Sequence, residues 1–161
     1  FGKAAIMFPL ITSVWEVWKA KEILDTVKLE LDKEGIAYDH HLQVGIMIET
    51  PAAALISDRL AKEVDFFSIG TNDLSQYTLV VDRTSRVLSD FFNPHHPAVL
   101  KLIQMTVENA HKAGIWVGIC GELGADLSMT EQFLKWGVDE FSVAPYSILP
   151  LRKKVRETSL A

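Results

Sequence analysis

GICGELGAD, residues 118–126, is the stretch that decides the fold. It closes an apolar run, residues 115–119, and carries the only cysteine of the chain, Cys120, two residues before the carboxylate of Glu122. An apolar run of this length is typical of a buried β-strand. Because the run ends in Cys-Gly-Glu, we expect its thiol to leave the core and to face a pocket.

Two other apolar runs end in polar residues in the same way. Residues 44–48 lead into Glu49-Thr50-Pro51, and residues 64–69 lead into Gly70-Thr71-Asn72-Asp73. Reactive groups at the carboxyl ends of successive parallel strands are how a β/α barrel builds its active site. The sequence therefore predicts a parallel sheet with a functional site at one edge.

Apolar runs and helical patterns alternate along the whole chain. Strands are expected over residues 5–9, 44–48, 66–69, 116–119 and 140–143. Helices are expected from Ser13 to about residue 34 with a stop at Gly35, from Thr50 as N-cap and Pro51 in the first turn through Ala52 to about residue 62, near residues 74–77, from Pro97 to near Gly114, from Ser128 to Gly137, and from Ser147 onward. Ser13 with Glu16, and Ser128 with Glu131, have the spacing of capping boxes.

This order amounts to about five βα units, so the fold class is α/β. A complete (β/α)8 TIM barrel needs about 250 residues. The alternatives are an open α/β sheet and a partial TIM barrel whose units correspond to the later strands. Chemistry at three successive strand ends, in place of one switch point, favours the partial barrel.

Composition limits the classes of function. The 161 residues are 48% hydrophobic, which fits one soluble globular domain. A net charge of −5 gives no support for a nucleic-acid partner, and no apolar run approaches the ~20 residues of a membrane span. A single cysteine excludes an internal disulfide and indicates a cytoplasmic protein. Because the chain begins at Phe1, we expect it to be trimmed or cut from a longer protein.

Glu49 and Asp73 are candidate metal ligands, since each follows a strand end one βα unit apart. Mg²⁺ takes one or two protein carboxylates and fills its shell with water and substrate oxygens. The alternative is that both carboxylates cap backbone amides in tight turns. Asn72 lies in the same Gly-Thr-Asn-Asp segment, whose successive amides are expected to form either an anion nest or an ordinary turn.

Arg83 and Cys120 are the other candidates. A guanidinium suits bidentate capture of phosphate or carboxylate, although a solvated arginine is the commoner case. Cys120 is either an inert buried thiol or a reactive one at a strand end. The pairs His40-His41 and His95-His96 are interpreted as loop residues, because adjacent side chains in extended chain point in opposite directions.

Four motifs then occur in a known order. They are GIMIETPAAA (residues 45–54), FFSIGTNDLSQYTLVVDR (66–83), HPAVLKLI (96–103) and GICGELGAD (118–126). This set resembles the phosphoenolpyruvate-binding barrel of enzyme I of the bacterial sugar phosphotransferase system. The likeness covers essentially residues 1–161, as the C-terminal portion of that barrel domain. Pyruvate phosphate dikinase and phosphoenolpyruvate synthase have similar motifs, but the continuation Gln76-Tyr77-Thr78 favours enzyme I.

The resemblance implies a role for each candidate. Glu49 and Asp73 would hold Mg²⁺, Asn72, Asp73 and Arg83 would bind phosphoenolpyruvate, and Cys120 would handle the proton at its methylene carbon. The phosphoryl group would pass to an enzyme histidine and on to a histidine-containing carrier protein, releasing pyruvate for sugar uptake. The family also forms homodimers through this barrel.

The chain departs from the family pattern by what it lacks. The further substrate-binding arginines and the phosphate-accepting histidine belong to segments outside this sequence, and none of the five histidines matches the acceptor. We therefore expect the isolated chain to make no pyruvate. Two alternatives stay open: a fragment of the dikinase or the synthase, and a non-catalytic interaction module that keeps the fold.

Overall fold

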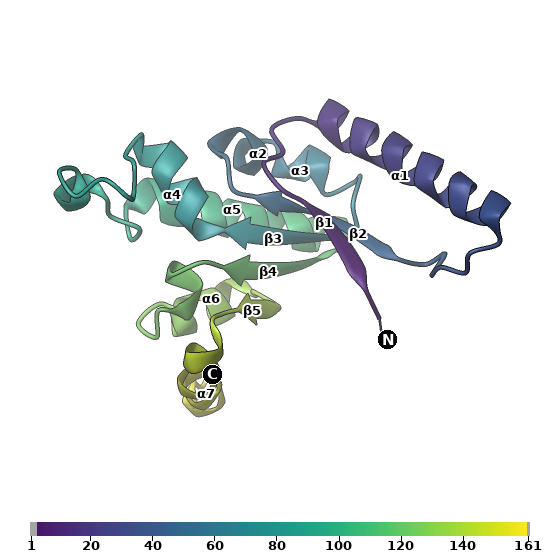
Figure 1. Cartoon of the computed structure of the whole chain (residues 1–161). Coiled ribbons are helices and arrows are strands. Elements are labelled where there is room, and N and C mark those ends of the chain that lie inside the picture. The colour runs from purple at the N-terminus through teal and green to yellow at the C-terminus, as the bar shows by residue number, and fades with distance from the viewer. Residues whose placement is uncertain (1–2, 161) are drawn as a thin grey trace.

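A computed structural model describes residues 3–160, and within them five strands form one sheet (Figure 1). The strands are β1 (Ala5–Phe8), β2 (Gln43–Ile48), β3 (Phe66–Gly70), β4 (Trp116–Cys120) and β5 (Glu140–Ser142). Every neighbouring pair is parallel, and the spatial order is β1-β2-β3-β4-β5. The predicted strands are confirmed, with β1 and β5 at the two edges.

The connections between the strands are helical. The helices are α1 (Val14–Glu34), α2 (Pro51–Leu55), α3 (Ser57–Leu60), α4 (Thr71–Leu79), α5 (Pro97–Ala113), α6 (Thr130–Trp136) and α7 (Pro145–Glu157). Two short 3₁₀ turns, η1 (Ser89–Phe91) and η2 (Leu123–Ala125), lie in the loops after β3 and β4. Strand order that follows chain order, with a helix in each crossover, is the arrangement of a barrel wall.

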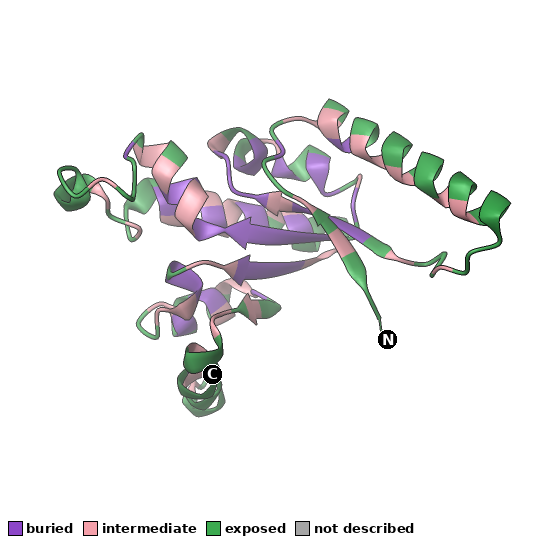
Figure 2. Cartoon of the chain, viewed as in Figure 1, coloured by how far each residue is buried: buried purple, intermediate pink, exposed green. Residues whose placement is uncertain are grey.

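The two faces of the sheet differ in what they carry. Side chains alternate along a strand, and one set is fully buried and joins the helices in a single core: Ile46, Ile48, Phe67, Ile69, Val117 and Ile119 pack with Val17, Leu74 and Ile103. The alternate residues, such as Met47, Ser68 and Cys120, therefore lie on the opposite face. Figure 2 shows β3 buried along its whole length, and β2 and β4 are buried over most of theirs.

Aromatic packing covers part of that opposite face. The Phe66 ring lies where a side chain at Gly45 would be, 2.4 Å from the position of a β-carbon. It stacks on Trp116 with ring centroids 4.4 Å apart and planes 6° from parallel. Gly45 in β2 thus makes room for the ring of Phe66, which belongs to β3 and packs against both β2 and β4.

The first helix begins and ends as its sequence predicts. Ser13 Oγ accepts from the Glu16 amide, and Glu16 reaches back to the Ser13 amide, so the capping box is complete. Gly35 ends the helix in the left-handed region, with φ +69°.

Two predictions about the middle of the chain need correction. The helix expected after Thr50 and Pro51 begins as predicted, with Thr50 as its N-cap, but it does not continue to residue 62: it is divided into α2 and α3 at Ile56, where φ −109° and ψ 19° leave the helical region. The Ser57 hydroxyl donates to the Ala54 carbonyl oxygen at 2.8 Å and stabilises this break. The helix expected near residues 74–77 is longer, because α4 begins at Thr71 directly after β3.

Two predicted helix starts near the C-terminus are wrong. Ser128 does not cap α6, because its amide and hydroxyl both donate to Asp126 Oδ1, at 2.8 and 2.7 Å. This local turn competes with the capping box and moves the N-cap to Met129. The last helix begins at Pro145, two residues before Ser147, since proline suits the first helical turn.

Candidate active site

The register of the sheet brings three strand ends together. Ile48 pairs with Ile69, and Gly70 pairs with Cys120, so Glu49, Gly70 and Cys120 lie in neighbouring positions at the carboxyl edge. A β-carbon at Gly70 would lie 2.8 Å from Glu49 Oε2, which means that the Glu49 carboxylate occupies the space above this glycine. Glu49 thus lies on the same face of the sheet as Cys120, opposite the helices.

Glu49 is a buried acid. Glu49 is only 3% exposed, and its Oε1 accepts a hydrogen bond from the Leu10 amide at 2.8 Å. Burial raises the pKa of Glu49, the Leu10 amide opposes this, and the charge and hydrogen bond of Asp73 raise it further. The two carboxyl groups therefore lie together, and a cation between them would stabilise both. This chemistry fits Mg²⁺, which favours carboxylate oxygens.

Leu10 holds an uncommon backbone conformation beside this carboxylate. Its φ is +53°, in the left-handed region that non-glycine residues rarely adopt. The conformation directs its amide at Glu49. No sequence pattern indicated this contact, since it joins residues 39 positions apart.

Asp73 and Arg83 come from the first turn of α4 and from the loop that follows this helix. Arg83 Nη2 lies 3.9 Å from Asp73 Oδ1, and each side chain is more than a third exposed. Val80, at φ +55°, ends α4, and the Arg83 amide donates to Gln76 Oε1 at 3.2 Å, which ties the start of the loop to α4. A long, exposed ion pair is weak, so the guanidinium is available to an anion.

Asn72 joins the start of α4 to the turn after β4. Its Oδ1 accepts from the Glu122 amide at 3.0 Å, and the neighbouring Thr71 hydroxyl donates to the Cys120 carbonyl oxygen at 2.7 Å. Gly121, at φ +87°, allows this approach, because a β-carbon there would lie 2.4 Å from Thr71 Oγ1. The Gly-Thr-Asn-Asp segment, for which an anion nest and an ordinary turn were the alternatives, leads directly into α4, which begins at Thr71.

Cys120 is a half-buried thiol at the end of β4. The Ser68 hydroxyl donates to its sulfur at 3.8 Å. Burial raises the pKa of Cys120, the Ser68 hydrogen bond opposes this, and the charges of Glu49, Glu140 and Asp73 raise it further. The thiol is therefore protonated at neutral pH, which is the form that can donate a proton. Ser68 went unnoticed in the sequence because a serine inside an apolar run carries no distinctive pattern.

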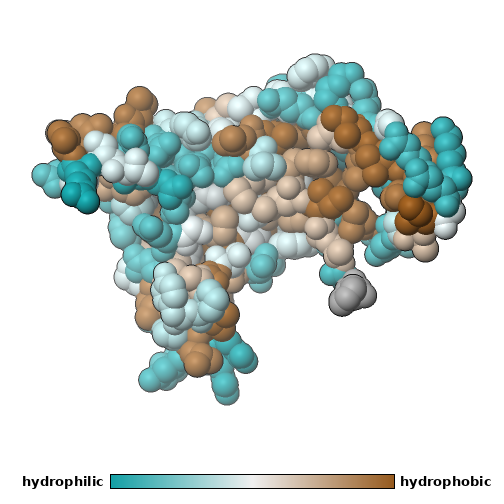
Figure 3. Space-filling model, viewed as in Figure 1, coloured by the Kyte–Doolittle hydropathy of each residue, from teal (hydrophilic) through white to brown (hydrophobic). Residues whose placement is uncertain are grey.

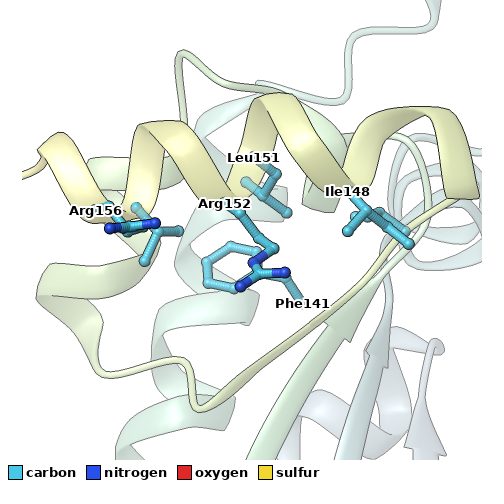
Figure 4. A pocket seen from close by; sticks show the side chains of 7 residues that line it. Phe141, Ile148, Leu151, Arg152 and Arg156 are labelled. Atoms are coloured by element: carbon cyan, nitrogen blue, oxygen red, sulfur yellow. The ribbon is translucent and has the colours of Figure 1, made fainter.

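Two surface hollows clarify where the site lies. A hollow of about 340 Å³ contains Asn72, Gly121 and Glu122 together with residues that open α7. A second, of about 290 Å³, lies between β5 and α7 and is lined by Phe141, Val143, Ile148, Leu151, Val155 and the two arginines Arg152 and Arg156 (Figure 4). The second hollow is more apolar but contains none of the candidate residues, so the strand-end cluster is the better candidate site.

Two further observations concern metals and membranes. Within residues 3–160, no group of three or more His, Cys, Asp and Glu side chains gathers as a metal cage, so a cation at Glu49 and Asp73 would have two protein carboxylates. No helix among these residues combines the length and apolar character needed to span a membrane.

Comparisons with known proteins show the family of this chain. The family model described as "PEP-utilising enzyme, PEP-binding domain" matches residues 1–160. The phosphoenolpyruvate-protein phosphotransferase of Haemophilus influenzae is 49% identical over 159 residues, covering 99% of this chain and 28% of that protein. The Bacillus subtilis protein of the same name is 47% identical, with the same coverage of both chains. The chain thus spans little more than a quarter of these curated relatives.

Solved structures confirm the fold. A citrate lyase from Burkholderia xenovorans superposes with TM-score 0.64 at 20% identity, covering 94% of this chain and 48% of that one. The CitE protein of Mycobacterium tuberculosis, solved with magnesium and acetate, gives TM-score 0.62 at 16% identity, covering 97% and 59%. These likenesses support the α/β partial barrel. From the family match and the identity along its whole length, the chain belongs to the PEP-binding domain family of the PEP-utilising enzymes.

Proposed function

We propose that this chain is the phosphoenolpyruvate- and Mg²⁺-binding part of a phosphoenolpyruvate-protein phosphotransferase, the C-terminal portion of its barrel domain. The whole enzyme moves the phosphoryl group from phosphoenolpyruvate to one of its histidines and on to a histidine-containing carrier protein, in cytoplasmic sugar uptake. The observation that carries the proposal is that Glu49, Asp73, Arg83 and Cys120 meet at one edge of the sheet. The acceptor histidine and the carrier-binding surface belong to the longer protein, since this chain covers 28% of its relatives.

Substrate binding follows from charge. Phosphoenolpyruvate carries a phosphate and a carboxylate, and the chain has a net charge of −5, so attraction must come from local groups. Arg83 supplies a planar guanidinium beside the carboxylates, and the side-chain amide of Asn72 supplies hydrogen-bond donors. Asp73 lies between these two residues and Glu49, where it can orient the substrate.

Glu49 and Asp73 are the residues that would hold Mg²⁺. Their carboxyl groups lie together, and burial, with the charge and hydrogen bond of Asp73 as smaller causes, raises the pKa of Glu49. When bound there, the ion supplies positive charge to the substrate oxygens and to the enolate. The Leu10 amide fixes Glu49 Oε1 and so orients the carboxylate before any ion arrives.

Cys120 performs the proton step. Cleavage of the P–O bond leaves the enolate of pyruvate. The methylene carbon then forms a C–H bond with the thiol proton, the S–H bond breaks, and the thiolate regains a proton from solvent. The raised pKa of Cys120, caused chiefly by burial, keeps the thiol protonated at neutral pH. Cys120 pairs with Gly70, and the Glu49 carboxylate lies over this glycine, so the thiol lies beside the carboxylate cluster.

The test separates binding from proton transfer in a full-length enzyme that carries this sequence. Cys120→Ala should keep Mg²⁺-dependent binding of phosphoenolpyruvate while pyruvate formation falls at least about a hundredfold, the scale of a lost general acid. Asp73→Ala should abolish turnover, whereas Asp58→Ala, an exposed carboxylate in α3, should leave both unchanged. Normal pyruvate formation by Cys120→Ala would contradict the assigned role.

Self-association is also part of the proposal. Several large apolar side chains of α1 face solvent, including Trp15, Ile23 and Leu29, which are 61%, 68% and 60% exposed. Figure 3 shows hydrophobic atoms gathered on the side of the molecule where α1 lies. A homodimer would cover some of this surface. Sedimentation of the full-length enzyme measures it, and a monomer at all concentrations would contradict the proposal.

A further inference from the structure

A single histidine ties two loops of the candidate site together. The loop over residues 80–96, between α4 and α5, carries Arg83 near its start and His95 near its end. His95 Nε2 donates to Asp126 Oδ2 at 2.7 Å, and Asp126 lies six residues after Cys120. Figure 1 shows the loop at the left of the view, beyond α4. The bond thus connects the segment with the guanidinium to the segment with the thiol.

Both partners of this bond are held in place. Asp126 Oδ1 accepts from the Ser128 amide and hydroxyl, which leaves Oδ2 for His95. Burial tends to raise the pKa of Asp126, but the Ser128 and His95 hydrogen bonds outweigh it and lower that pKa, so the carboxylate is ionised and accepts. On the other side, the His95 amide donates to Asn93 Oδ1 at 3.0 Å, which fixes the backbone that carries the ring.

The middle of the loop is held mainly by local bonds. Thr84 donates to Asp82 at 2.7 and 2.8 Å, and the Ser89 hydroxyl donates to the Arg86 carbonyl oxygen. Val87 and Phe91 are 87% and 70% exposed, so hydrophobic packing contributes little to its position. Near Arg83, the contacts are a 3.2 Å bond to Gln76 and the 3.9 Å pair with Asp73. The bond from His95 to Asp126 is therefore well placed to fix the far end.

We propose that His95 and Asp126 are positioning residues, which hold the Arg83 loop against the turn that follows Cys120. With the bond formed, the guanidinium and the thiol address the same bound anion; without it, the loop samples other positions and binding weakens. This role rests on the proposed function, because it assigns Arg83 to phosphoenolpyruvate. His95 and Asp126 act through Arg83 and not on the reacting atoms.

The chain contains a matched control for the test. His111 Nε2 donates to Asp139 Oδ2 at 3.0 Å, so the residue types are the same and the exposure is similar, 39% and 44% against 45% and 28%. This second pair lies at the end of α5 and just before β5. It is thus near the amino-terminal ends of β4 and β5, whereas Cys120 is at the carboxyl-terminal end of β4. Loss of either pair should cost similar stability, but only the first should affect substrate binding.

The first experiment uses steady-state kinetics of the full-length enzyme. His95→Ala and Asp126→Asn should each raise the KM for phosphoenolpyruvate about threefold to tenfold, the scale of a partly exposed charged hydrogen bond, with kcat within twofold. Asp126→Asn retains Oδ1 for Ser128. The double variant should be no worse than either single one, His95→Gln should restore part of the affinity because it keeps an N–H donor, and His111→Ala should leave KM unchanged.

The second experiment reads the loop without any ligand. Arg83 and Arg86 are trypsin sites inside it. Cleavage of the wild-type chain after these residues should be slow, and it should accelerate at least about threefold in His95→Ala and Asp126→Asn but not in His111→Ala. An active wild type whose His95→Ala variant keeps its KM and its cleavage rate would overturn the positioning role alone. A wild-type enzyme that forms no pyruvate would overturn the proposed function, and with it this role.

Discussion

Gly121→Ala tests the closest contact in the candidate site. The substitution places a methyl group 2.4 Å from Thr71 Oγ1 and 2.9 Å from Asn72 Oδ1. It also forces alanine into φ +87°, which costs about 1–2 kcal/mol, and overpacking adds about 1–3 kcal/mol. If Thr71 moves away, its 2.7 Å bond to the Cys120 carbonyl oxygen is lost, for about 1 kcal/mol more. We expect a total loss of about 3–6 kcal/mol, out of a stability of about 5–15 kcal/mol.

Urea denaturation of the purified chain measures this loss, and Gly114→Ala is the control. Gly114 has a similar φ, +79°, but a β-carbon there would meet nothing within 4 Å, so only the backbone cost applies. The difference between the two variants isolates the contact with Thr71 and Asn72. Equal free energies of unfolding for both variants would show that the turn after β4 does not press on α4 as described.

Three other outcomes follow from the same structure. The Thr12 amide, with further hydrogen bonds from Thr12 and Ser13, lowers the pKa of Glu16 below 4.5. The stabilisation that the Glu16 carboxylate gives is therefore present above pH 4.5 and is lost as the pH falls through the lower pKa of the folded state. Denaturation at several pH values should show that Glu16→Gln costs about 0.5–1 kcal/mol at about pH 7 and nothing in strong acid. Mg²⁺ should raise the melting temperature of the chain, and this rise should vanish in Glu49→Gln but persist in Glu131→Gln, whose carboxylate forms an ion pair with Lys135. The isolated chain with phosphoenolpyruvate, Mg²⁺ and carrier protein should form no pyruvate in a coupled assay, and steady turnover would show that it is a complete catalyst.

Much of the fold could be predicted from short-range patterns. The five strands were recognisable as apolar runs, and α1 and α5 were delimited by Gly35 and Gly114, whose left-handed conformations end helices. The two errors near the C-terminus share one cause, because Ser128 and Ser147 have the composition of caps but neighbouring residues decide where each helix begins. Asp126 attracts Ser128, and Pro145 starts α7 earlier, so local competition decides which serine serves as a cap.

The candidate site was predictable in its members but not in its connections. Glu49, Asp73 and Cys120 follow apolar runs, which is visible in the sequence, and their convergence depends on parallel pairing. The contacts that hold them come from distant segments: Leu10 reaches Glu49 across 39 positions, and His95 reaches Asp126 across 31. Loop residues without a periodic pattern reveal such partners only when the chain is folded.

The parallel register of β2, β3 and β4, together with the alternation of side chains along a strand, decides which side of the sheet the Cys120 thiol faces. Cys120 and Ile119 face opposite sides of the sheet, so deleting one residue between Trp116 and Cys120 would turn the sulfur into the helix-packed core while Ile119 entered the site. Deleting two would restore the facing but shorten the strand. The candidate site therefore keeps its side chains on the same face only when a strand changes length by two residues, and its loops are far freer to change length than its strands.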